Sequence, residues 1–369
     1  MGILFTRHEY SGGLPVKSIN SVILGTNRNR CIGYVMAIRS AFVLITMFMM
    51  VATTTDDARA CASCGCTLSP DWDTLQASKE AGFKFDIRYD YLTQDQLRSG
   101  RNAISSGAAS QVTNNGDPQE VEKYTKNNYV TLGIDYTSAR NWGLNAQVPY
   151  IDRKHSTLGV NSDGNSPGNG AYDSRTSNLG DIKIMGRYQG FTEQHNIGIL
   201  FGIKLPTGSY TQAGASTDPT NRGAVAQIDR GLQPGTGTTD VIIGAFFADS
   251  LRLDWGYFAQ ILYQQALDSK ADYKPGNAVN VNLGIRYEGF AGFFPNLQLN
   301  FREVQSDSGE NADTVSTGGT LVYLSPGISV PINSQVSVFG FVQVPLYQDV
   351  NGVQLVPQFT TSIGARYSF

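Results

Sequence analysis

The sequence predicts an all-β protein, a transmembrane antiparallel up-and-down β-barrel of about twelve strands with a short N-terminal periplasmic segment. Three observations predict this fold. Apolar and polar residues alternate along many segments, these segments are long, and the connections between them alternate between tight turns and long polar loops. The composition agrees, because only 16% of the 369 residues are charged while 40 are Gly. Soluble domains average roughly 25% charged residues. A net charge of −3 and a pI near 5.7 argue against nucleic-acid binding.

The alternation is clearest over residues 83–91, where every odd position is apolar or aromatic and every even position is charged. Such a two-faced strand packs in a soluble sandwich or crosses a membrane with its apolar face toward lipid. Length favours the membrane, because most of the twelve segments have 10–14 residues. Soluble strands average about 5–6 residues, and a tilted membrane crossing needs roughly 9–11. The expected strands are 81–92, 127–138, 142–154, 180–189, 195–206, 238–248, 252–265, 277–288, 295–305, 317–330, 335–347 and 354–369.

The connections after even-numbered strands are tight, and three after odd-numbered strands are long, polar and Gly-rich. This pattern is typical of barrels with short periplasmic turns and long outer loops. The expected tight turns are 138–141, 190–194, 249–251, 289–294 and 331–334, the long loops are 93–126, 155–179 and 207–237, and the last outer turn is Val350–Val353 with its Asn-Gly pair.

Aromatic residues are expected to form two girdles at the membrane interfaces. Those expected at the periplasmic strand ends are Tyr136, Trp142, Tyr188, Trp255, Tyr287 and Tyr367, and those at the outer ends are Tyr89, Tyr91, Tyr150 and Tyr263. Core aromatics of a soluble sandwich would not gather at strand ends.

The N-terminal region resembles an export signal. The apolar run 41–52 is too short for a membrane-spanning helix of about 20 residues. It follows Arg39 and precedes Ala58-Arg59-Ala60, which predicts a signal peptide over 36–60 with cleavage before Cys61. Residues 1–35 are interpreted as an upstream extension from a misplaced start codon. The mature protein is expected in the outer membrane of a Gram-negative bacterium.

The segment 61–80 is expected to form a Cys-rich periplasmic head. Cys61, Cys64 and Cys66 have a spacing that suits a soft metal ion. The oxidising periplasm favours a disulfide, within or between chains, and lipidation of Cys61 is a third alternative. Ser69-Pro70-Asp71-Trp72-Asp73 has the signals of a helix start, so Trp72 could anchor a plug in the periplasmic mouth. The alternative is a tether without fixed structure.

Assigning strand faces by alternation gives a charged set that points into the lumen. The predicted pore-lining residues are Lys84, Asp86, Arg88, Asp90, Asp181, Lys183, Arg187, Lys204, Arg286, Glu288, Arg302 and Arg366. Most are expected to pair across strands and brace the wall, and a few at a constriction would set selectivity. The full inward-facing set also includes Arg153, Asp135, Asp240 and Asp254, so nine basic residues face seven acidic ones, which indicates at most a weak preference for anions.

The chain shows no convincing enzyme signature. Gly164-Asn165-Ser166-Pro167-Gly168 matches the G-x-S-x-G pattern, but it lies in a loop rather than in the required strand-to-helix turn. His155 and Ser156 are adjacent, so on a strand they point to opposite faces. The sequence therefore predicts no catalytic residues.

Several stretches of the sequence resemble motifs of known outer-membrane proteins. The end of the chain, Ile363 to Phe369, resembles the assembly signal of outer-membrane barrels, which implies the barrel-assembly machinery as a partner through Phe369. Residues 178–188 (NLGDIKIMGRY) and 202–208 (GIKLPTG) resemble the paired motifs of the MetA-pathway phenol-degradation family, as do 234–237 with Asp240 and Val350-Asn351-Gly352.

The resemblance to this family covers about residues 120–369 and implies an outer-membrane transporter. The expected function is a channel for passive passage of small, aromatic or weakly polar solutes through the outer-membrane lipid. The alternative is a barrel scaffold whose Cys-rich head binds a soft metal or docks a redox partner.

Overall fold

The computed structural model describes residues 81–369 except 115–116, 119–120, 139–140, 159–170, 216–224 and 253. The described residues belong to one compact unit, residues 57–369. The expected N-terminal extension, signal peptide and Cys-rich head, with Cys61, Cys64, Cys66 and Trp72, lie outside the described residues. No helix among the described residues is long and apolar enough to cross a membrane.

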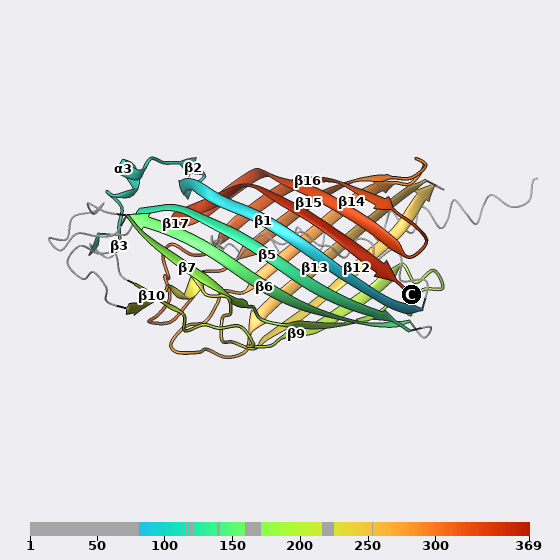
Figure 1. Ribbon diagram of the computed structural model, residues 1–369, viewed down its shortest axis with the longest axis horizontal. Helices are drawn as coiled ribbons and strands as arrows, with labels where there is room; N and C mark the ends of the chain where they lie inside the picture. The colour runs from blue at the N-terminus through green and yellow to red at the C-terminus, as the bar shows by residue number, and fades with distance from the viewer. Residues whose placement is uncertain are drawn as a thin grey trace, which may run out of the picture. The chain divides into compact units, whose positions relative to one another are not determined.

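The described strands form a closed, antiparallel barrel (Figure 1). Each strand pairs with its neighbours along the chain, and β17 returns to pair with β1, which closes the barrel. Its strands are β1 (Gly82–Gly100), β5 (Val121–Thr137), β6 (Trp142–Leu158), β8 (Lys183–Tyr188), β9 (Ile197–Lys204), β12 (Asp240–Arg252), β13 (Trp255–Ala266), β14 (Ala278–Tyr287), β15 (Phe294–Val304), β16 (Gly319–Pro331) and β17 (Val336–Ser368). The predicted barrel class is confirmed.

The long strand β17 consists of two antiparallel arms. Residues 337–350 pair with β16, and residues 353–368 pair with β1. The chain reverses at Asn351-Gly352, where Gly352 has a φ of +43° that favours glycine. At the open end of this hairpin, the Ser368 N–H donates to the Gln335 carbonyl at 2.8 Å. Counting the two arms separately, the described barrel has the twelve passes that the sequence predicts.

The fourth pass differs from the expected strand 180–189. It starts earlier, as β7 (Ala171–Leu179), which pairs with residues 150–158 of β6. It resumes as β8, which pairs with residues 142–147 of β6. Gly180, Asp181 and Ile182 interrupt it. The expected loop 155–179 is therefore partly strand. The outer half was not recognised because Ala171–Leu179 is polar and lacks an apolar face.

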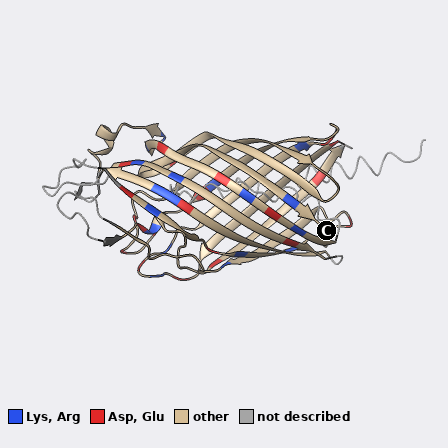
Figure 2. Cartoon of the chain, viewed as in Figure 1, with Lys and Arg blue, Asp and Glu red and all other residues tan. Residues whose placement is uncertain are grey.

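The two faces of the strands differ as the alternation predicts. On β1, Phe83, Phe85, Ile87 and Tyr89 are exposed, whereas Lys84 and Arg88 between them are buried in the barrel. The same outward apolar face recurs around the barrel, at Leu132, Ile199, Leu283 and Val344 among others. Water would not stabilise such a continuous exposed apolar surface, so this face is the one that meets lipid. Figure 2 shows the charged positions along the strands.

Aromatic rings cluster at the strand ends that carry the tight turns. Trp142 packs on Tyr188 with ring centroids 4.7 Å apart, and Trp255 packs on Tyr287 at 4.9 Å. At the barrel closure, Phe369 stacks on Phe85 at 5.5 Å. These pairs form part of the predicted periplasmic girdle.

The outer connections carry the remaining elements. The first contains β2 (Asn102–Ala103), the four-residue helix α3 (Ser106–Ala109), β3 (Thr113–Asn114) and β4 (Asp117–Pro118). The third, residues 205–239, contains the short pair β10 (Ala213–Ala215) and β11 (Val225–Gln227), followed by a 3-10 turn, η1 (Arg230–Leu232). Part of this connection contacts the inner wall of the barrel, as described next.

Candidate functional site inside the barrel

Buried ion pairs brace the part of the lumen wall formed by β1, β5 and β8. Arg187 binds Asp135 through two hydrogen bonds, of 2.6 Å from Nη1 and 3.0 Å from Nη2, and both side chains are almost fully buried. Further outward, Arg88 Nε donates to Asp90 Oδ2 at 2.8 Å. The Arg187–Asp135 pair joins β8 to β5 across the intervening β6, whereas Arg88 and Asp90 both lie on β1.

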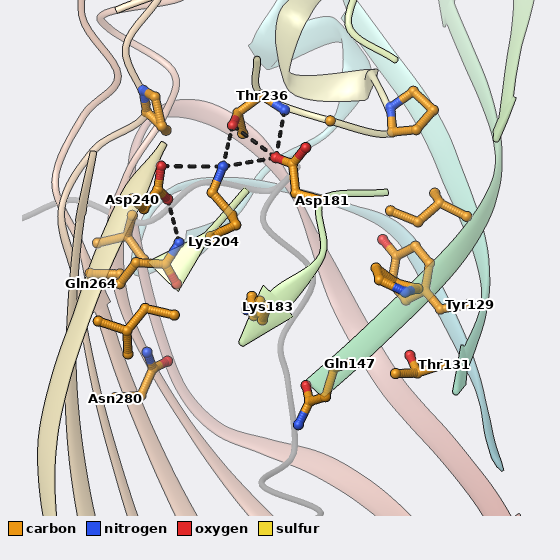
Figure 3. A pocket seen from close by; sticks show the side chains of 18 of the residues that line it. Tyr129, Thr131, Gln147, Asp181, Lys183, Lys204, Thr236, Asp240, Gln264 and Asn280 are labelled. Carbon is orange, nitrogen blue, oxygen red and sulfur yellow. Dashed lines mark hydrogen bonds and ion pairs between the residues drawn. The ribbon is translucent and has the colours of Figure 1, made fainter. Parts of the chain in front are cut away.

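The interruption at Gly180–Ile182 turns Asp181 into the lumen, where it meets Lys204 at the end of β9. Lys204 Nζ lies 2.8 Å from Asp181 Oδ2 and 3.2 Å from Asp240 Oδ1 (Figure 3). It also donates to the hydroxyl of Thr236 and, at 2.9 Å, to the carbonyl of Thr238. One lysine therefore joins three separate parts of the chain.

Asp181 also binds the backbone of the long outer connection. Its Oδ1 accepts the Gly208 N–H at 2.9 Å, and its Oδ2 accepts the Thr236 N–H at 3.0 Å. Gly208 and Gly235 pack backbone against backbone, since a Cβ on Gly235 would lie 2.5 Å from the Gly208 carbonyl oxygen. The two ends of the connection are thus drawn together beside Asp181.

The segment 229–238 of this connection, here called the inner segment, also contacts β6 and β7. Arg153 of β6 donates from Nη1 to the Gly231 carbonyl at 2.7 Å, and Thr176 of β7 donates to the Leu232 carbonyl at 2.7 Å. The Leu232 side chain is buried. The inner segment is therefore held against the wall near both of its ends, and it lines a cavity inside the barrel.

Arg230 fixes the turn of the inner segment. Its guanidinium lies over the rings of Tyr210 and Tyr273, 4.7 and 4.8 Å from their centroids. Its Nη2 donates to the carbonyls of Thr236 at 2.6 Å and Lys270 at 3.2 Å. These contacts link the inner segment to the next outer loop.

A cavity of about 320 Å³ lies beside the inner segment, within the size range of small-molecule sites. Its wall combines charged, amide and apolar side chains from β1, β5, β6, β8, β9, β12, β13, β14 and β15. The charged residues of the wall are Arg88, Asp90, Arg153, Asp181, Lys183, Lys204, Arg230, Asp240 and Arg302. Basic groups therefore outnumber acidic ones.

A chain of amide hydrogen bonds crosses the opposite part of the wall, on β13 to β17. Asn300 is its hub: it donates to Asn282 Oδ1 at 2.7 Å and accepts from the Ser325 hydroxyl at 2.6 Å. Asn282 in turn donates to Gln260 at 3.1 Å, and Gln343 donates to Asn300 at 3.4 Å. We call this set the amide wall.

The predicted pore-lining residues separate into three groups in the structure. Arg88, Asp90, Asp181, Lys183, Lys204 and Arg302 line the cavity; Lys84, Asp86, Arg187 and Arg366 lie deeper inside the barrel; Arg286 and Glu288 pair with each other at the end of β14. Whether they govern passage of a solute stays a prediction.

Sequence reasoning missed the inner segment and the amide wall. The G-T-G-T run at 235–238 signals backbone flexibility, but nothing in it indicates that it enters the barrel. No cluster of three His, Cys, Asp or Glu side chains suited to a metal ion occurs in the part of the chain that the structure describes.

Comparisons with known proteins agree on the fold. An outer membrane channel from Pseudomonas putida F1 has 13% sequence identity and a TM-score of 0.55, over 86% of this chain and 100% of that chain. The CymD monoaromatic hydrocarbon channel has 9% identity and a TM-score of 0.45, over 85% and 98% of the two chains. The Ralstonia pickettii toluene transporter TbuX has 12% identity and a TM-score of 0.45, over 79% and 90%.

No family model matches the chain, and no curated protein matches it. The likeness to the Pseudomonas putida channel, together with the outward apolar face and the polar lumen, defines the class of the fold: it is that of a bacterial outer-membrane β-barrel. The barrel expected from the sequence motifs is confirmed.

Proposed function

We propose that the protein is a passive channel that admits small solutes across the outer membrane. The observation that carries this proposal is the cavity between the inner segment and the barrel wall, lined by polar and charged groups while the outer face is apolar. A twelve-pass barrel lies between eight-stranded barrels filled by their own side chains and 16-stranded porins with an aqueous channel. Such a barrel suits a narrow pathway with a constriction.

The inner segment is the constriction of this pathway. It is held by a hydrogen bond that it donates to Asp181 and by two that it accepts from Arg153 and Thr176, rather than by a strand ladder, so its position depends on a few polar contacts. The likeness to an outer membrane channel supports this function, and so does the placement of charged groups along the lumen.

Single-channel recording in planar bilayers tests the proposal. The purified full chain is expected to give small, uniform conductance steps in KCl. Gly235→Ala places a methyl group against the Gly208 carbonyl oxygen and displaces the inner segment, so its conductance is expected to be larger. Gly107→Ala, in a place where a Cβ meets nothing closer than 3.9 Å, is the matched control and should behave as the wild type. Absence of conductance in the wild type and in both variants would contradict the channel function.

The C-terminal residue supports a second proposal, about assembly. Besides stacking on Phe85, Phe369 hydrogen bonds through its N–H to the Phe83 carbonyl at 3.0 Å, although its side chain remains 57% exposed. We propose that this exposed ring is read by the barrel-assembly machinery. Phe369→Ser is expected to lower the amount of folded barrel in cells but to refold normally from urea into detergent. Phe359→Ser, at an exposed position within the same arm, should show no such difference.

The Cys-rich head is the basis of an alternative function, in which the barrel is a scaffold for a soft metal or a redox partner. The C-x-x-C-x-C spacing of Cys61, Cys64 and Cys66 favours it. Metal analysis of the purified mature chain tests this alternative: a bound metal ion that is lost in a variant with all three cysteines changed to Ser would support it. A metal-free protein with a disulfide would contradict it.

A further inference from the structure

Lys183 stands out among the cations of the lumen. It lies on β8 beside Lys204, and it lines the cavity (Figure 3). Within the described ranges, no hydrogen bond or ion pair engages its ammonium group. Arg302 and Lys204, which carry the same charge as Lys183, line the same cavity.

The carboxylates nearby are already engaged. Asp181 and Asp240 both bind Lys204, and Asp240 also accepts a hydrogen bond from Gln264. Asp90 binds Arg88 on the same strand. The acids of the cavity wall therefore have partners of their own, and Lys183 is left facing the cavity without a dedicated counter-ion.

Arg302 is only partly satisfied. Its Nη1 donates to Asn280 Oδ1 at 2.7 Å, but its Nε is buried and has no hydrogen-bond partner in the described part of the chain. A buried donor without an acceptor is costly unless a ligand supplies one. An anion in the cavity beside Lys183 would supply both charge and acceptor oxygens.

An apolar surface lies next to these cations, inside the lumen. Met185, Ile242 and Leu262 line the cavity, and Met185 and Leu262 pack against a buried cluster formed by Leu200, Phe246, Ala248 and Phe258. In a purely water-filled pore, such an apolar surface would be exposed to water at a cost in free energy. It suits the hydrocarbon part of a solute.

Two lumen-facing glycines let the side chains of this surface pack closely against the barrel backbone. Gly202 lies opposite Ile242 in the β9–β12 register, and Gly244 lies opposite Leu262 in the β12–β13 register. A Cβ on Gly202 would lie 2.7 Å from the Met185 side chain, and one on Gly244 would lie 2.7 Å from the Leu262 side chain. Larger residues at these positions would displace Met185 or Leu262 from the wall of the cavity.

From these observations we propose that the cavity is a binding site for a small organic carboxylate, whose anionic end binds Lys183 and Arg302 and whose apolar body lies on Met185, Ile242 and Leu262. The site rests on the proposed channel function, because the carboxylate would be the solute that the channel admits. A cation would meet the basic excess of the wall, a neutral hydrocarbon would leave Lys183 without a partner, and an inorganic anion would gain nothing from the apolar surface.

Calorimetric titration of the purified full chain in detergent tests the site, with benzoate as the probe. Benzamide is the neutral isostere, and acetate lacks the apolar body. Benzoate is expected to bind more tightly than either. Because a hydrogen bond to a charged group contributes about 1.5–3 kcal/mol, Lys183→Gln should weaken benzoate binding about tenfold or more and leave benzamide unaffected.

Three further variants separate the parts of the site. Lys183→Arg keeps the charge and should retain binding, which also shows that the position tolerates substitution. Leu262→Gln should weaken benzoate but not acetate. Lys154→Gln removes an exposed lysine on the outer face of β6 and is the matched control, expected to bind benzoate as the wild type does.

The proposal is overturned if benzamide or acetate binds as tightly as benzoate, or if Lys183→Gln and Lys154→Gln bind benzoate equally well. These outcomes are independent of the channel function. Conductance without benzoate binding would refute the site alone, whereas benzoate binding without conductance would refute the channel and leave the site.

Discussion

Ion pairs hold one side of the barrel lumen, and neutral amide hydrogen bonds hold the other. On β1, β5, β8 and β9 the buried contacts are charged, as in Arg187–Asp135 and Lys204–Asp181. On β13 to β17 the amide wall joins Gln260 to Gln343 through Asn300 without a charge. The buried ion pairs with Asp135, Asp181 and Asp240 thus lie on one side, whereas Arg302 on β15 binds the neutral Asn280, so a solute in the lumen meets an uneven electrostatic field.

The largest expected loss of stability comes from removing a buried ion pair on the charged side of the lumen. Arg187→Met leaves Asp135 buried without its counter-ion, which should lower the free energy of unfolding by about 3–5 kcal/mol. Urea unfolding of the detergent-refolded protein measures this loss. Arg175→Met removes an exposed pair with Asp152 and should lower the free energy of unfolding far less than Arg187→Met does. Equal losses in the two variants would show that burial of the Arg187 pair has no energetic consequence.

A smaller loss of stability is expected when a hydrogen bond of the amide wall is removed. Asn300→Leu leaves the Ser325 hydroxyl and Asn282 without their shared partner, at a cost of about 1–3 kcal/mol. The ion selectivity, measured as the reversal potential in a KCl gradient, should not change because no charge is removed. The control is Asn296→Leu. Both polar atoms of the Asn296 side chain are buried without a hydrogen-bond partner among the described residues, so this variant should be neutral or stabilising.

The smallest expected change in stability concerns the carboxylate of Asp307, in the connection that follows β15. Burial raises the pKa of Asp307 above its ordinary value of 3.8, while hydrogen bonds from the Gly276 N–H and the Tyr273 hydroxyl lower it, and Asp313 raises it. A raised folded-state pKa means that the contribution of Asp307 to stability is complete below the unfolded pKa and is lost as pH rises through the folded pKa.

The wild type should therefore gain stability on acidification from pH 7 to pH 4 relative to Asp307→Asn, which does not titrate. Thermal unfolding at the two pH values measures the difference. A gain of the same size in both proteins would show that another group is responsible.

Much of the barrel was predictable because its determinants are local. Each strand crosses between lipid and lumen, so its residues alternate, as in 83–91, and each periplasmic turn is short enough to read from the sequence. The second arm of β17 was predictable from the Asn-Gly pair at 351–352 for the same reason.

The site was less accessible to such reasoning, because its determinants are not local. The charged strand residues of the cavity followed from alternation, but Arg230, in an outer connection, did not, and neither did the partners of these residues. The position of Thr236 depends on Asp181, which lies at an interruption of a different strand. The residues of the amide wall occupy the polar positions of alternating strands, and hydropathy does not distinguish a hydrogen-bonded Asn300 from one that only faces water.

The pairing of β1 with the second arm of β17 has a consequence for how the chain folds. Phe83 and Phe369 exchange backbone hydrogen bonds. The edge of β1 that faces β17 therefore stays unpaired until Phe369 and the rest of the second arm of β17 are in place. Contacts between such distant parts of a sequence form slowly, and two unpaired strand edges remain open until they do. Until closure, both edges are templates for pairing with another chain, so the lifetime of the open sheet sets the risk of aggregation.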